Sequence, residues 1–272
     1  MRAISIMNTI LNIIFVTGAI VIFILLCIGI FFFIVTRGTL LYRKLFRVPI
    51  SVTSHIYPAY SERWLIRIID FQPLISALLL FQYPKIVDHI VAEVEKNSLS
   101  GKRMLITSCA FGNVIPRIVR ACKKQHAERI IITDIIPDEL FRVREKLSGL
   151  TDTVDFVTEN AAEMKQKNGS VEINVLFFLL HELPHQLQES ALREAGRVLS
   201  SGGKLILAEF HRPDALLMRL LSRLYFFVFE PYGFALWGDR DPVLVLEKTG
   251  KWTCERTTHF FGNYQVIIAT KG

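Results

Sequence analysis

The stretch Met104-Leu-Ile-Thr-Ser-Cys-Ala-Phe-Gly-Asn113 decides how this sequence is interpreted. An apolar strand, Arg103–Thr107, leads into a turn, and a helix is predicted directly afterwards over Val114–Lys123. Such turns usually carry several glycines, because only glycine lets the backbone approach a nucleotide-type ligand closely. Here Gly112 is the only glycine of the turn, and no acidic residue ends the strand. The turn is therefore either a lost ligand site or a specialised form of one.

Strands and helices alternate downstream of this turn, which is typical of a parallel sheet covered by helices. Apolar runs predict further strands, and a helix is expected before the last of them. The closing segments around Gly262-Asn263 predict an antiparallel hairpin. In chain order the strands are expected at Arg129–Thr133, Val154–Val157, Ile173–Phe178 and Lys204–Glu209, the helix at Gln186–Val198, a turn at Ser200–Gly203, and the hairpin strands at Trp252–Thr258 and Tyr264–Thr270.

The N-terminal segment is far more apolar than the rest of the chain. Hydrophobic residues make up 51% of the 272 residues, and Ile10–Val35 is almost wholly apolar. This run is long enough to cross a hydrocarbon core of roughly 30 Å with some tilt. A cleaved signal peptide is disfavoured, because the run is too long and no small-residue cleavage site follows it. We expect a retained, single-pass transmembrane helix.

Charge predicts the orientation and the partners of this anchor. Arg37, Arg43, Lys44 and Arg47 follow the apolar run, whereas only Arg2 precedes it. The positive-inside rule then places the rest of the chain on the cytoplasmic face. The net charge of +7 suits a protein held against anionic membrane lipid. No basic stripe is interleaved with aromatics, so nucleic acid is not an expected partner.

The four cysteines predict neither disulfides nor a metal site. Cys27 lies in the apolar run, Cys109 lies in the turn after the first strand, and Cys122 and Cys254 stand alone. No C-x-x-C pair or Cys/His metal spacing is found. This usage suits a reducing cytoplasm.

We expect three parts in the chain: an anchor over residues 1–36, a connecting part over 37–99, and a catalytic domain over 100–272. The connecting part begins with a basic segment that reaches about Tyr60. Glu62–Gln82 is apolar but interrupted by charges and by Pro73. It predicts one or two amphipathic helices that lie on the membrane, cap a pocket or pack into the domain core. A further helix is expected at Lys85–Lys96.

Together these features predict an α/β protein with a Rossmann-like class I methyltransferase fold. Its sheet would be mostly parallel with a terminal antiparallel hairpin, and one N-terminal transmembrane helix would precede it. Ligands of open α/β sheets bind outside the carboxyl ends of the strands. The residues that follow the strands are therefore the candidates for chemistry.

The turn after the first strand is the first candidate. Ser108, Cys109 and Ala110 are small enough to allow close approach of a cofactor to the backbone, and Gly112 adds freedom. Cys109 is more readily a packing residue than a nucleophile, because no His or basic partner is near it in sequence.

The turns after the second and third strands supply further candidates. Asp134 can accept hydrogen bonds from both hydroxyls of a ribose, or it can be a helix cap or a surface acid. Asn160 and Ala161 can contact the edge of an adenine, or they can belong to an ordinary polar turn.

The ends of the fourth and fifth strands carry the candidates for catalysis. His181 and Glu182 can act as an acid/base pair, or they can cap the following helix. His211 follows the fifth strand, and with Glu209 these residues could form a proton-transfer or divalent-metal cluster. The aromatic stretch Leu224–Trp237 lines a hydrophobic channel or is a core helix; the sequence leaves both open.

Several motifs resemble those of the rhodoquinone-biosynthesis methyltransferase-like family, within the class I S-adenosylmethionine-dependent proteins. The resemblance begins near Glu62-Arg-Trp-Leu65 and covers most of the chain from there. Its most specific elements are the fourth-strand and hairpin motifs. The matching stretches are Cys109-Ala-Phe-Gly-Asn-Val-Ile-Pro-Arg117, Leu176-Phe-Phe-Leu-Leu-His-Glu182, Arg193-Glu-Ala-Gly-Arg-Val198, Gly202-Gly-Lys204, His211-Arg-Pro213, Glu230-Pro231 and Phe260-Phe-Gly-Asn-Tyr-Gln265.

The resemblance implies a domain that binds S-adenosyl-L-methionine and acts on a polyprenyl quinone. The family's namesake activity replaces a quinone methoxy group by an amine, with a divalent metal such as manganese. This sequence departs from the family at Ser54–Tyr60, where an aromatic run is expected, and in its added anchor. The resulting hypothesis is a membrane-anchored enzyme that transfers a methyl or amino group to a lipophilic quinone. The alternatives are a methyltransferase for another lipid or small molecule, or a scaffold that keeps the fold without catalysis.

Overall fold

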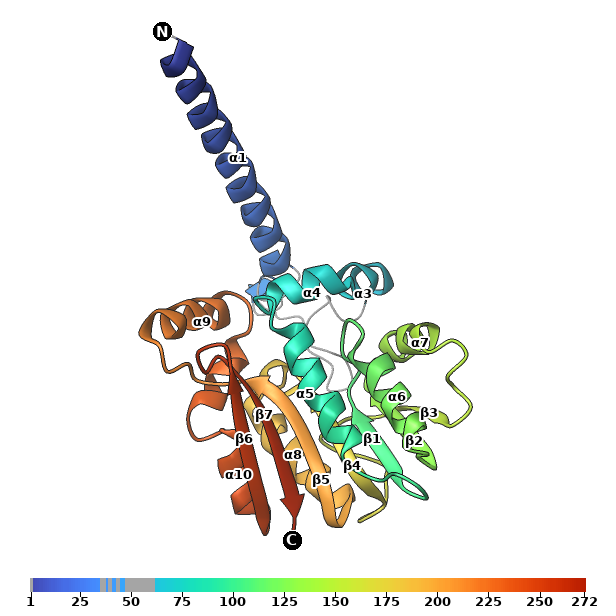
Figure 1. Ribbon diagram of the computed structural model, residues 1–272. Coiled ribbons are helices and arrows are strands. Elements are labelled where there is room, and N and C mark those ends of the chain that lie inside the picture. The colour runs from blue at the N-terminus through green and yellow to red at the C-terminus, as the bar shows by residue number, and fades with distance from the viewer. Residues whose placement is uncertain (1, 35–37, 39–40, 43–44, 47–61) are drawn as a thin grey trace.

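The computed structural model describes residues 2–34, 38, 41–42, 45–46 and 62–272. Its centre is a seven-stranded sheet with the order β3-β2-β1-β4-β5-β7-β6 (Figure 1). The five strands from β3 to β5 are parallel, whereas β7 runs antiparallel to both β5 and β6. The predicted fold is confirmed. The strands are β1 (Arg103–Thr107), β2 (Arg129–Asp134), β3 (Val154–Thr158), β4 (Val171–Phe177), β5 (Leu199–Phe210), β6 (Trp252–His259) and β7 (Tyr264–Lys271).

Helices cover both faces of the sheet and gather at one end of it. α5, α6 and α7 lie on one face, and α8 and α10 lie on the other. The helices are α1 (Arg2–Phe33), α3 (Arg63–Ile69), α4 (Gln72–Leu78), α5 (Tyr83–Glu95), α6 (Val114–Lys124), α7 (Pro137–Lys146), α8 (His185–Val198), α9 (Leu216–Val228) and α10 (Pro242–Thr249), with short 3₁₀ turns η3 (Leu180–Glu182) and η4 (Pro231–Trp237).

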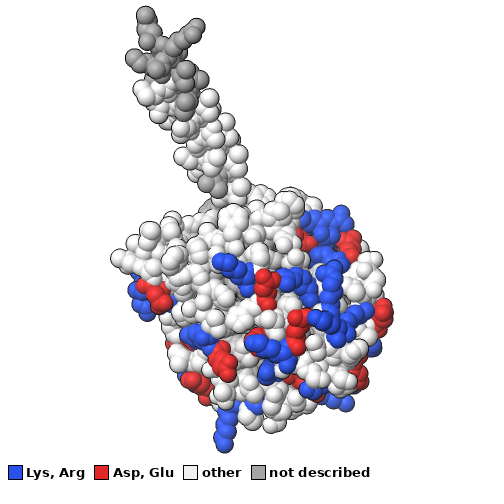
Figure 2. All heavy atoms as spheres, viewed as in Figure 1, with Lys and Arg blue, Asp and Glu red and all other residues white. Residues whose placement is uncertain are grey.

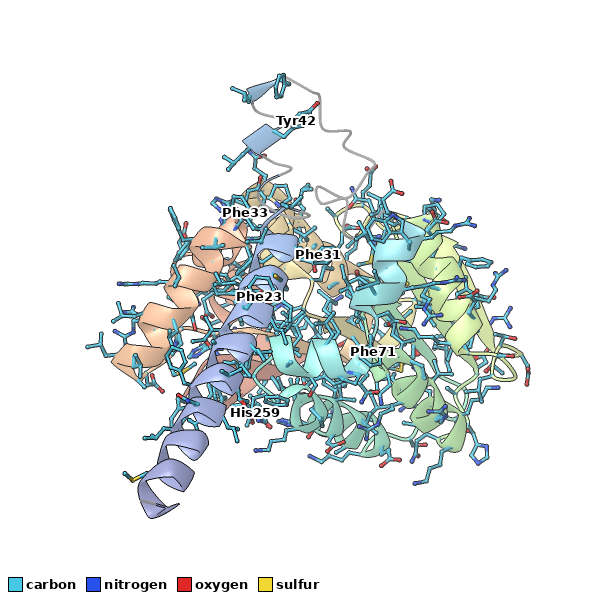
Figure 3. All side chains as sticks on the ribbon, turned by 90° about the horizontal axis from the view of Figure 1, so that it is seen from above. Phe23, Phe31, Phe33, Tyr42, Phe71 and His259 are labelled. Carbon is cyan, nitrogen blue, oxygen red and sulfur yellow. The ribbon has the colours of Figure 1, made fainter. Side chains whose placement is uncertain are left out.

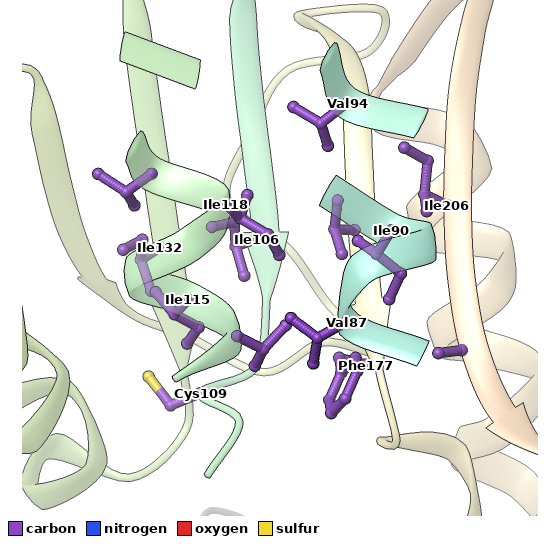
Figure 4. Packing of buried hydrophobic residues seen from close by; sticks show 14 of the residues in the cluster. Val87, Ile90, Val94, Ile106, Cys109, Ile115, Ile118, Ile132, Phe177 and Ile206 are labelled. Atoms are coloured by element: carbon purple, nitrogen blue, oxygen red, sulfur yellow. The ribbon is translucent and has the colours of Figure 1, made fainter. Parts of the chain in front are cut away.

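The core lies between the sheet and its helices. Figure 4 shows Ile90 of α5 facing Ile206 of β5, and Ile118 of α6 beside Ile106 of β1. All four side chains are buried, and burying one such side chain contributes about 1.5–3 kcal/mol relative to exposure. The core thus includes α5, which precedes the expected domain boundary at residue 100; that boundary stays a prediction.

The sequence did not predict every element. α7 and α10 were missed, although Pro137 at the start of α7 and the two acids that follow it are typical of a helix N-terminus. Ser200–Gly203 was expected as a turn, and this prediction was wrong, because β5 begins at Leu199. In this region the pairing of β5 with β4 shifts between Val171 and Ile173.

Helices α3 and α4 both cap the domain and expose apolar side chains, two of the alternatives that the sequence left open. One side of α3 is buried, including Leu65 and Ile69, while Trp64 and Ile68 are exposed. α4 meets α5 at 100°, so that α5 runs along the sheet while α4 crosses its end. These two short helices therefore cap the domain and also present an apolar surface.

Helix α1 leaves the domain as a long rod (Figure 1). Its segment Leu11–Phe31 has a mean hydropathy of 3.1, and none of it is buried. The segment is long and apolar enough to cross a membrane, and helices of signal sequences near an N-terminus share these properties. The basic flank Arg37, Arg43, Lys44 and Arg47, and the stretch Ser54–Tyr60, lie outside the described residues. The orientation of the anchor stays a prediction.

Candidate functional site

A cavity of about 350 Å³ lies at the carboxyl ends of β1, β2, β4 and β5. Its size falls at the lower end of the range for small-molecule sites, roughly 300–1,000 Å³. Polar side chains, including Asp134 and His181, line the cavity at the strand ends, together with aromatic residues such as Phe177. The opposite side is apolar and comes from α4, with Leu78, and from the end of α1, with Ile28. The cavity therefore has a polar floor and an apolar wall.

The turn after β1 keeps its shape although it lacks most of the usual glycines. Ser108 has φ of +75°, in the left-handed region that glycine adopts at no steric cost. Its N–H donates to Thr133 O at 2.9 Å. The carboxylate of Asp134 accepts from Cys109 N at 2.6 Å and from Ser108 Oγ at 3.2 Å. Hydrogen bonds from β2 thus hold the strained residue in place.

Side chains from α3 and α7 hold the far end of the same turn. Asp70, at the end of α3, accepts from Gly112 N at 2.8 Å. Lys146 of α7 donates to Gly112 O at 2.9 Å and to Asp70 Oδ1 at 2.7 Å. Arg142 donates to the other oxygen of Asp70 at 2.8 Å. Because the Asp70 side chain is only 1% exposed, these charge-assisted bonds are shielded from water and are correspondingly strong.

Tyr83 of α5 explains why Gly112 is a glycine. Its hydroxyl donates to Phe111 O at 3.1 Å and accepts from Val114 N at 2.9 Å. A Cβ at Gly112 would come within 2.5 Å of this hydroxyl, and Gly112 has φ of +76°. The glycine is needed for packing against Tyr83, independently of any ligand.

The turn after β4 is built in the same way as the turn after β1. Phe178 has φ of +52°, and its N–H donates to Ala208 O of the neighbouring strand at 2.8 Å. The next amides, of Leu180 and His181, donate to Oε2 of Glu209 at 2.8 and 3.2 Å. Glu209 of β5 thus holds the turn after β4 in the same way that Asp134 of β2 holds the turn after β1.

Glu209 also binds the imidazole of His181. His181 Nδ1 lies 2.9 Å from Glu209 Oε1, and Glu209 is fully buried. Burial of the imidazole opposes its charge, but the adjacent Glu209 carboxylate outweighs this and raises the pKa of His181 to about 9. His181 is therefore a cation at neutral pH. Its Nε2 is 4.0 Å from Glu182 Oε1, and both residues line the cavity.

Residues 72–240 match the family model of the ubiE/COQ5 methyltransferase family. The chain belongs to this family. It is 30% identical over 192 residues to the ubiquinone/menaquinone biosynthesis C-methyltransferase UbiE of Sinorhizobium fredii, which covers 68% of this chain and 69% of that protein. The UbiE of Rhizobium leguminosarum bv. trifolii is 28% identical over 163 residues, or 58% of this chain. That match spans only 61% of the relative's own length.

Solved structures with low sequence identity share the fold of this ubiE/COQ5 family member. A SAM dependent methyltransferase from Aquifex aeolicus is 15% identical and has a TM-score of 0.53, over 78% of this chain and 99% of that chain. An O-methyltransferase family protein from Burkholderia thailandensis is 16% identical with a TM-score of 0.57, over 77% and 59%. The class I fold is thereby established, while the narrower rhodoquinone-biosynthesis resemblance stays a prediction.

Most of the predicted cofactor residues of this ubiE/COQ5 family member lie together. Ser108, Cys109, Ala110 and Asp134 all line the cavity, whereas Gly112 supports the turn from behind. Burial, and then the charge of Asp134, raises the pKa of the Cys109 thiol well above its usual range. This supports the packing role expected for Cys109, because the thiolate is the nucleophilic form.

The turn after β3 lies apart from the cavity lining. Neither Asn160 nor Ala161 is among the lining residues. The side chain of Asn160 accepts from Ala162 N at 2.9 Å, as in an ordinary polar turn. Their contact with a cofactor stays a prediction.

His211 is not brought to the catalytic cluster. It lines a separate surface cavity beside Asp241, and its Nδ1 is 2.8 Å from Gly262 O in the hairpin turn. The expected grouping of His211 with His181 is wrong. Strand β5 ends at Phe210, and hydrogen bonds to Gly262 and Asn263 of the hairpin turn hold His211 at the separate cavity. Among the described residues, no group of three or more His, Cys, Asp or Glu side chains is placed to hold a metal. These residues do not fit a manganese ion.

Glu139 is a lining residue that the sequence did not reveal. It lies in the first turn of α7 and is only 4% exposed. Burial, and then the charge of Asp134, raises the pKa of Glu139 well above its usual range. Its Oε1 is buried without a hydrogen-bond partner among the described residues. A protonated carboxyl group at this place can donate a hydrogen bond to a ligand.

An aromatic group borders the polar floor. Phe210 packs against His181, Phe178 and Tyr225, with ring centroids 4.9 to 5.5 Å apart. Tyr225 and Phe229 line the cavity, whereas Phe226 is in the core. The stretch Leu224–Trp237 thus serves both of the roles that the sequence left open.

The specific hairpin motif lies outside the cavity. Phe260 and Phe261 have φ of +49° and +54°, which makes the turn tight. Gln265 donates to Phe210 O at 2.9 Å. The motif therefore fixes the end of β5 and the adjacent Glu209.

Proposed function

We propose that this chain is an S-adenosylmethionine-dependent methyltransferase that modifies the ring of a lipophilic quinol. The observation that carries the proposal is the cavity itself, in which a charged floor meets an apolar wall. The floor suits a polar ring and a cofactor, and the wall, with Ile75 and Leu78 of α4, suits a lipid tail. The printed function of the UbiE relatives, C-methylation in quinone biosynthesis, agrees with this substrate class.

The residues present fit the cofactor. Small side chains at Ser108 and Ala110 leave the backbone of the turn open to the cavity, and Asp134 would accept from the ribose hydroxyls. A ribose hydroxyl would displace the Ser108 hydroxyl, whose 3.2 Å contact with Asp134 is longer than those of Cys109 N and Ile136 N. The Glu139 carboxyl, whose Oε1 has no hydrogen-bond partner among the described residues, would hydrogen-bond to the base of the cofactor.

The positive charge of His181 provides the catalytic interaction at the polar side of the cavity. When bound, the cofactor supplies an electrophilic methyl group, whose carbon–sulfur bond breaks with its electrons kept by sulfur while a ring carbon gains the methyl and loses a proton. The quinol would bind as its anion, after its hydroxyl has lost a proton to water, and His181 Nε2–H would donate to that oxygen and stabilise the negative charge that makes the ring carbon nucleophilic. Glu182 lies on the same side and accepts the departing proton. Glu209 acts through His181 and is a positioning residue.

Membrane attachment follows from the same proposal. In this proposal helix α1 spans the membrane, and the basic flank of the sequence favours a domain on the cytoplasmic face. An isoprenoid tail stays in the bilayer, so the enzyme works at its surface. Amino transfer to the ring, as in rhodoquinone biosynthesis, is the narrower form of this hypothesis, and no step is assigned to a metal because the described residues do not hold one.

Two measurements test the proposal. Titration calorimetry of the full chain in lipid nanodiscs should show binding of S-adenosylmethionine and of S-adenosylhomocysteine. Mass spectrometry of quinones from cells with and without the gene should then show a species with one more methyl group. A methoxy-to-amino exchange would select amino transfer instead. Absence of cofactor binding would contradict both and favour a scaffold without catalysis.

A further inference from the structure

Helix α9 turns an apolar face to the outside. Leu217, Leu220, Leu221, Leu224 and Phe227 are 51 to 68% exposed. Their spacing of three and four residues places them along one stripe of the helix. The opposite stripe packs inward through Ser222 and Phe226. A stripe of this kind normally faces a core, so its exposure marks an interaction surface.

A second exposed apolar group lies at the same end of the molecule. Trp64 and Ile68 of α3, with Phe71 just before α4 and Phe81 in the turn between α4 and α5, are 45 to 72% exposed. Figure 1 shows α3, α4 and α9 at the end of the domain from which α1 leaves, and Figure 3 shows the end of α1, near Phe31, between α4 and α9. We call these four residues and the stripe of α9 the apolar rim.

Charges are arranged to suit this rim. Figure 2 shows the surface around the base of α1 white in this view, with Lys, Arg, Asp and Glu concentrated farther down and over α7. Arg223 lies on α9 beside the leucine stripe, is exposed, and makes no salt bridge with a described residue. Arginines beside an apolar helix face extend to anionic lipid headgroups while their stems stay in contact with apolar surface.

We propose that the apolar rim is embedded in the membrane leaflet that α1 enters, with α9 lying along the membrane surface. A bilayer fits better than a protein partner because α1, which we propose spans the membrane, brings one to this end of the domain. Moving apolar side chains from water into lipid is favourable in proportion to the apolar area removed from water, so the five residues of the α9 stripe make a substantial contact. The domain is then held at three points, by α1, by α3–α4 and by α9.

With the rim in the leaflet, the apolar wall of the cavity lies next to the lipid. The cavity is lined by Ile28 of α1, Leu78 of α4 and Tyr225 of α9, which are the elements that border the rim. Its apolar wall therefore faces the interior of the leaflet. The inference rests on the proposed membrane attachment of α1, but it does not depend on which reaction the cavity performs.

Photo-crosslinking of the full chain tests the proposal. The protein carries p-benzoylphenylalanine at position 220 and is reconstituted in vesicles of phosphatidylcholine and phosphatidylglycerol. The matched control carries it at Leu244 of α10, an exposed leucine, 47% accessible, on a helix that Figure 1 places away from α1. We expect lipid adducts at 220 to exceed those at 244 by about 10-fold, because only the rim is at acyl-chain depth.

The same experiment with the crosslinker at position 217 tests whether the result at 220 comes from a local perturbation of α9 by the bulky side chain. Lipid adducts at both rim positions support the proposal. Crosslinks to a second copy of the chain, or lipid adducts no more frequent than at 244, would overturn it. The result is independent of cofactor binding and of quinone turnover, so a failure of the proposed function would leave it intact.

Discussion

The turns after β1 and β4 are two versions of one construction. In each, a residue other than glycine takes a left-handed conformation, Ser108 in one and Phe178 in the other. In each, a carboxylate from the neighbouring strand accepts the amides that follow, Asp134 in one and Glu209 in the other. The difference lies in what the carboxylate does next. Asp134 lines the cavity, whereas Glu209 is sealed from it and bonds the imidazole of His181.

This difference teaches how one local device can serve two purposes. A carboxylate that accepts hydrogen bonds from backbone amides fixes a turn. Its oxygens can accept further hydrogen bonds, either from a ligand or from a side chain. In the turn after β1 we propose that these further hydrogen bonds come from the cofactor. In the turn after β4 the further hydrogen bond is made with His181. The following changes would break or sharpen this contrast.

Glu209→Gln should have the largest effect. The amide removes the negative charge that keeps His181 protonated, so turnover should fall by about 10²–10³-fold, with cofactor affinity nearly unchanged. The alkaline limb of the pH–rate profile should also move to lower pH. Quinol methylation and calorimetry on the same preparation measure both. A loss of cofactor affinity equal to the loss of turnover would show that the two turns are not separate in function.

The stability of the fold should depend on pH through His181. Its pKa is about 9 in the folded chain against an ordinary 6.5, so its charge stabilises the fold fully below pH 6.5. That contribution, roughly 3 kcal/mol, is lost as the pH rises through 9. Thermal unfolding of the full chain in detergent, from pH 6 to 10, should show a steeper decline for the natural chain than for His181→Gln. Parallel curves would contradict the assignment.

Asp134→Asn should affect binding more than turnover. Loss of a charged acceptor costs about 1.5–3 kcal/mol, which corresponds to a roughly 10- to 150-fold weaker affinity for S-adenosylmethionine. Turnover at saturating cofactor should change much less. Calorimetry and steady-state kinetics separate the two quantities. Unchanged affinity would mean that Asp134 serves the turn alone.

Ser108→Gly should give the smallest effect, and it should be stabilising. Glycine removes the strain of φ +75° but gives up the 3.2 Å bond to Asp134, for a net gain of up to about 1 kcal/mol. Gly112→Ala is the matched control and should destabilise, since its Cβ would meet the Tyr83 hydroxyl at 2.5 Å. Thermal unfolding measures both. Destabilisation by Ser108→Gly would mean that its hydroxyl matters more than its backbone strain.

The sequence predicted those parts that depend on local pattern. The strands β1 and β2 are continuous apolar runs, the turn Gly262-Asn263 marks the closing hairpin, and the residues just after the parallel strands are candidates in any open sheet. These rules were sufficient for Asp134 and His181 as cavity residues, although their roles remain predictions.

The contacts that the sequence missed join distant segments. Asp70 and Gly112 are 42 residues apart, and no periodicity connects them. Glu139 was missed because α7 itself was not predicted. His211 was grouped wrongly because its position depends on the hairpin turn at Gly262, which only the packed sheet determines.

The end of helix α1 forms part of the cavity wall through Ile28 and Gly29. A water-soluble fragment cut after this helix would therefore lack a piece of its own binding chamber. Such a fragment could keep the fold and still misreport substrate preference. Replacing the helix by an unrelated membrane anchor would likewise alter the chamber, so the anchor and the domain are expected to evolve as one unit.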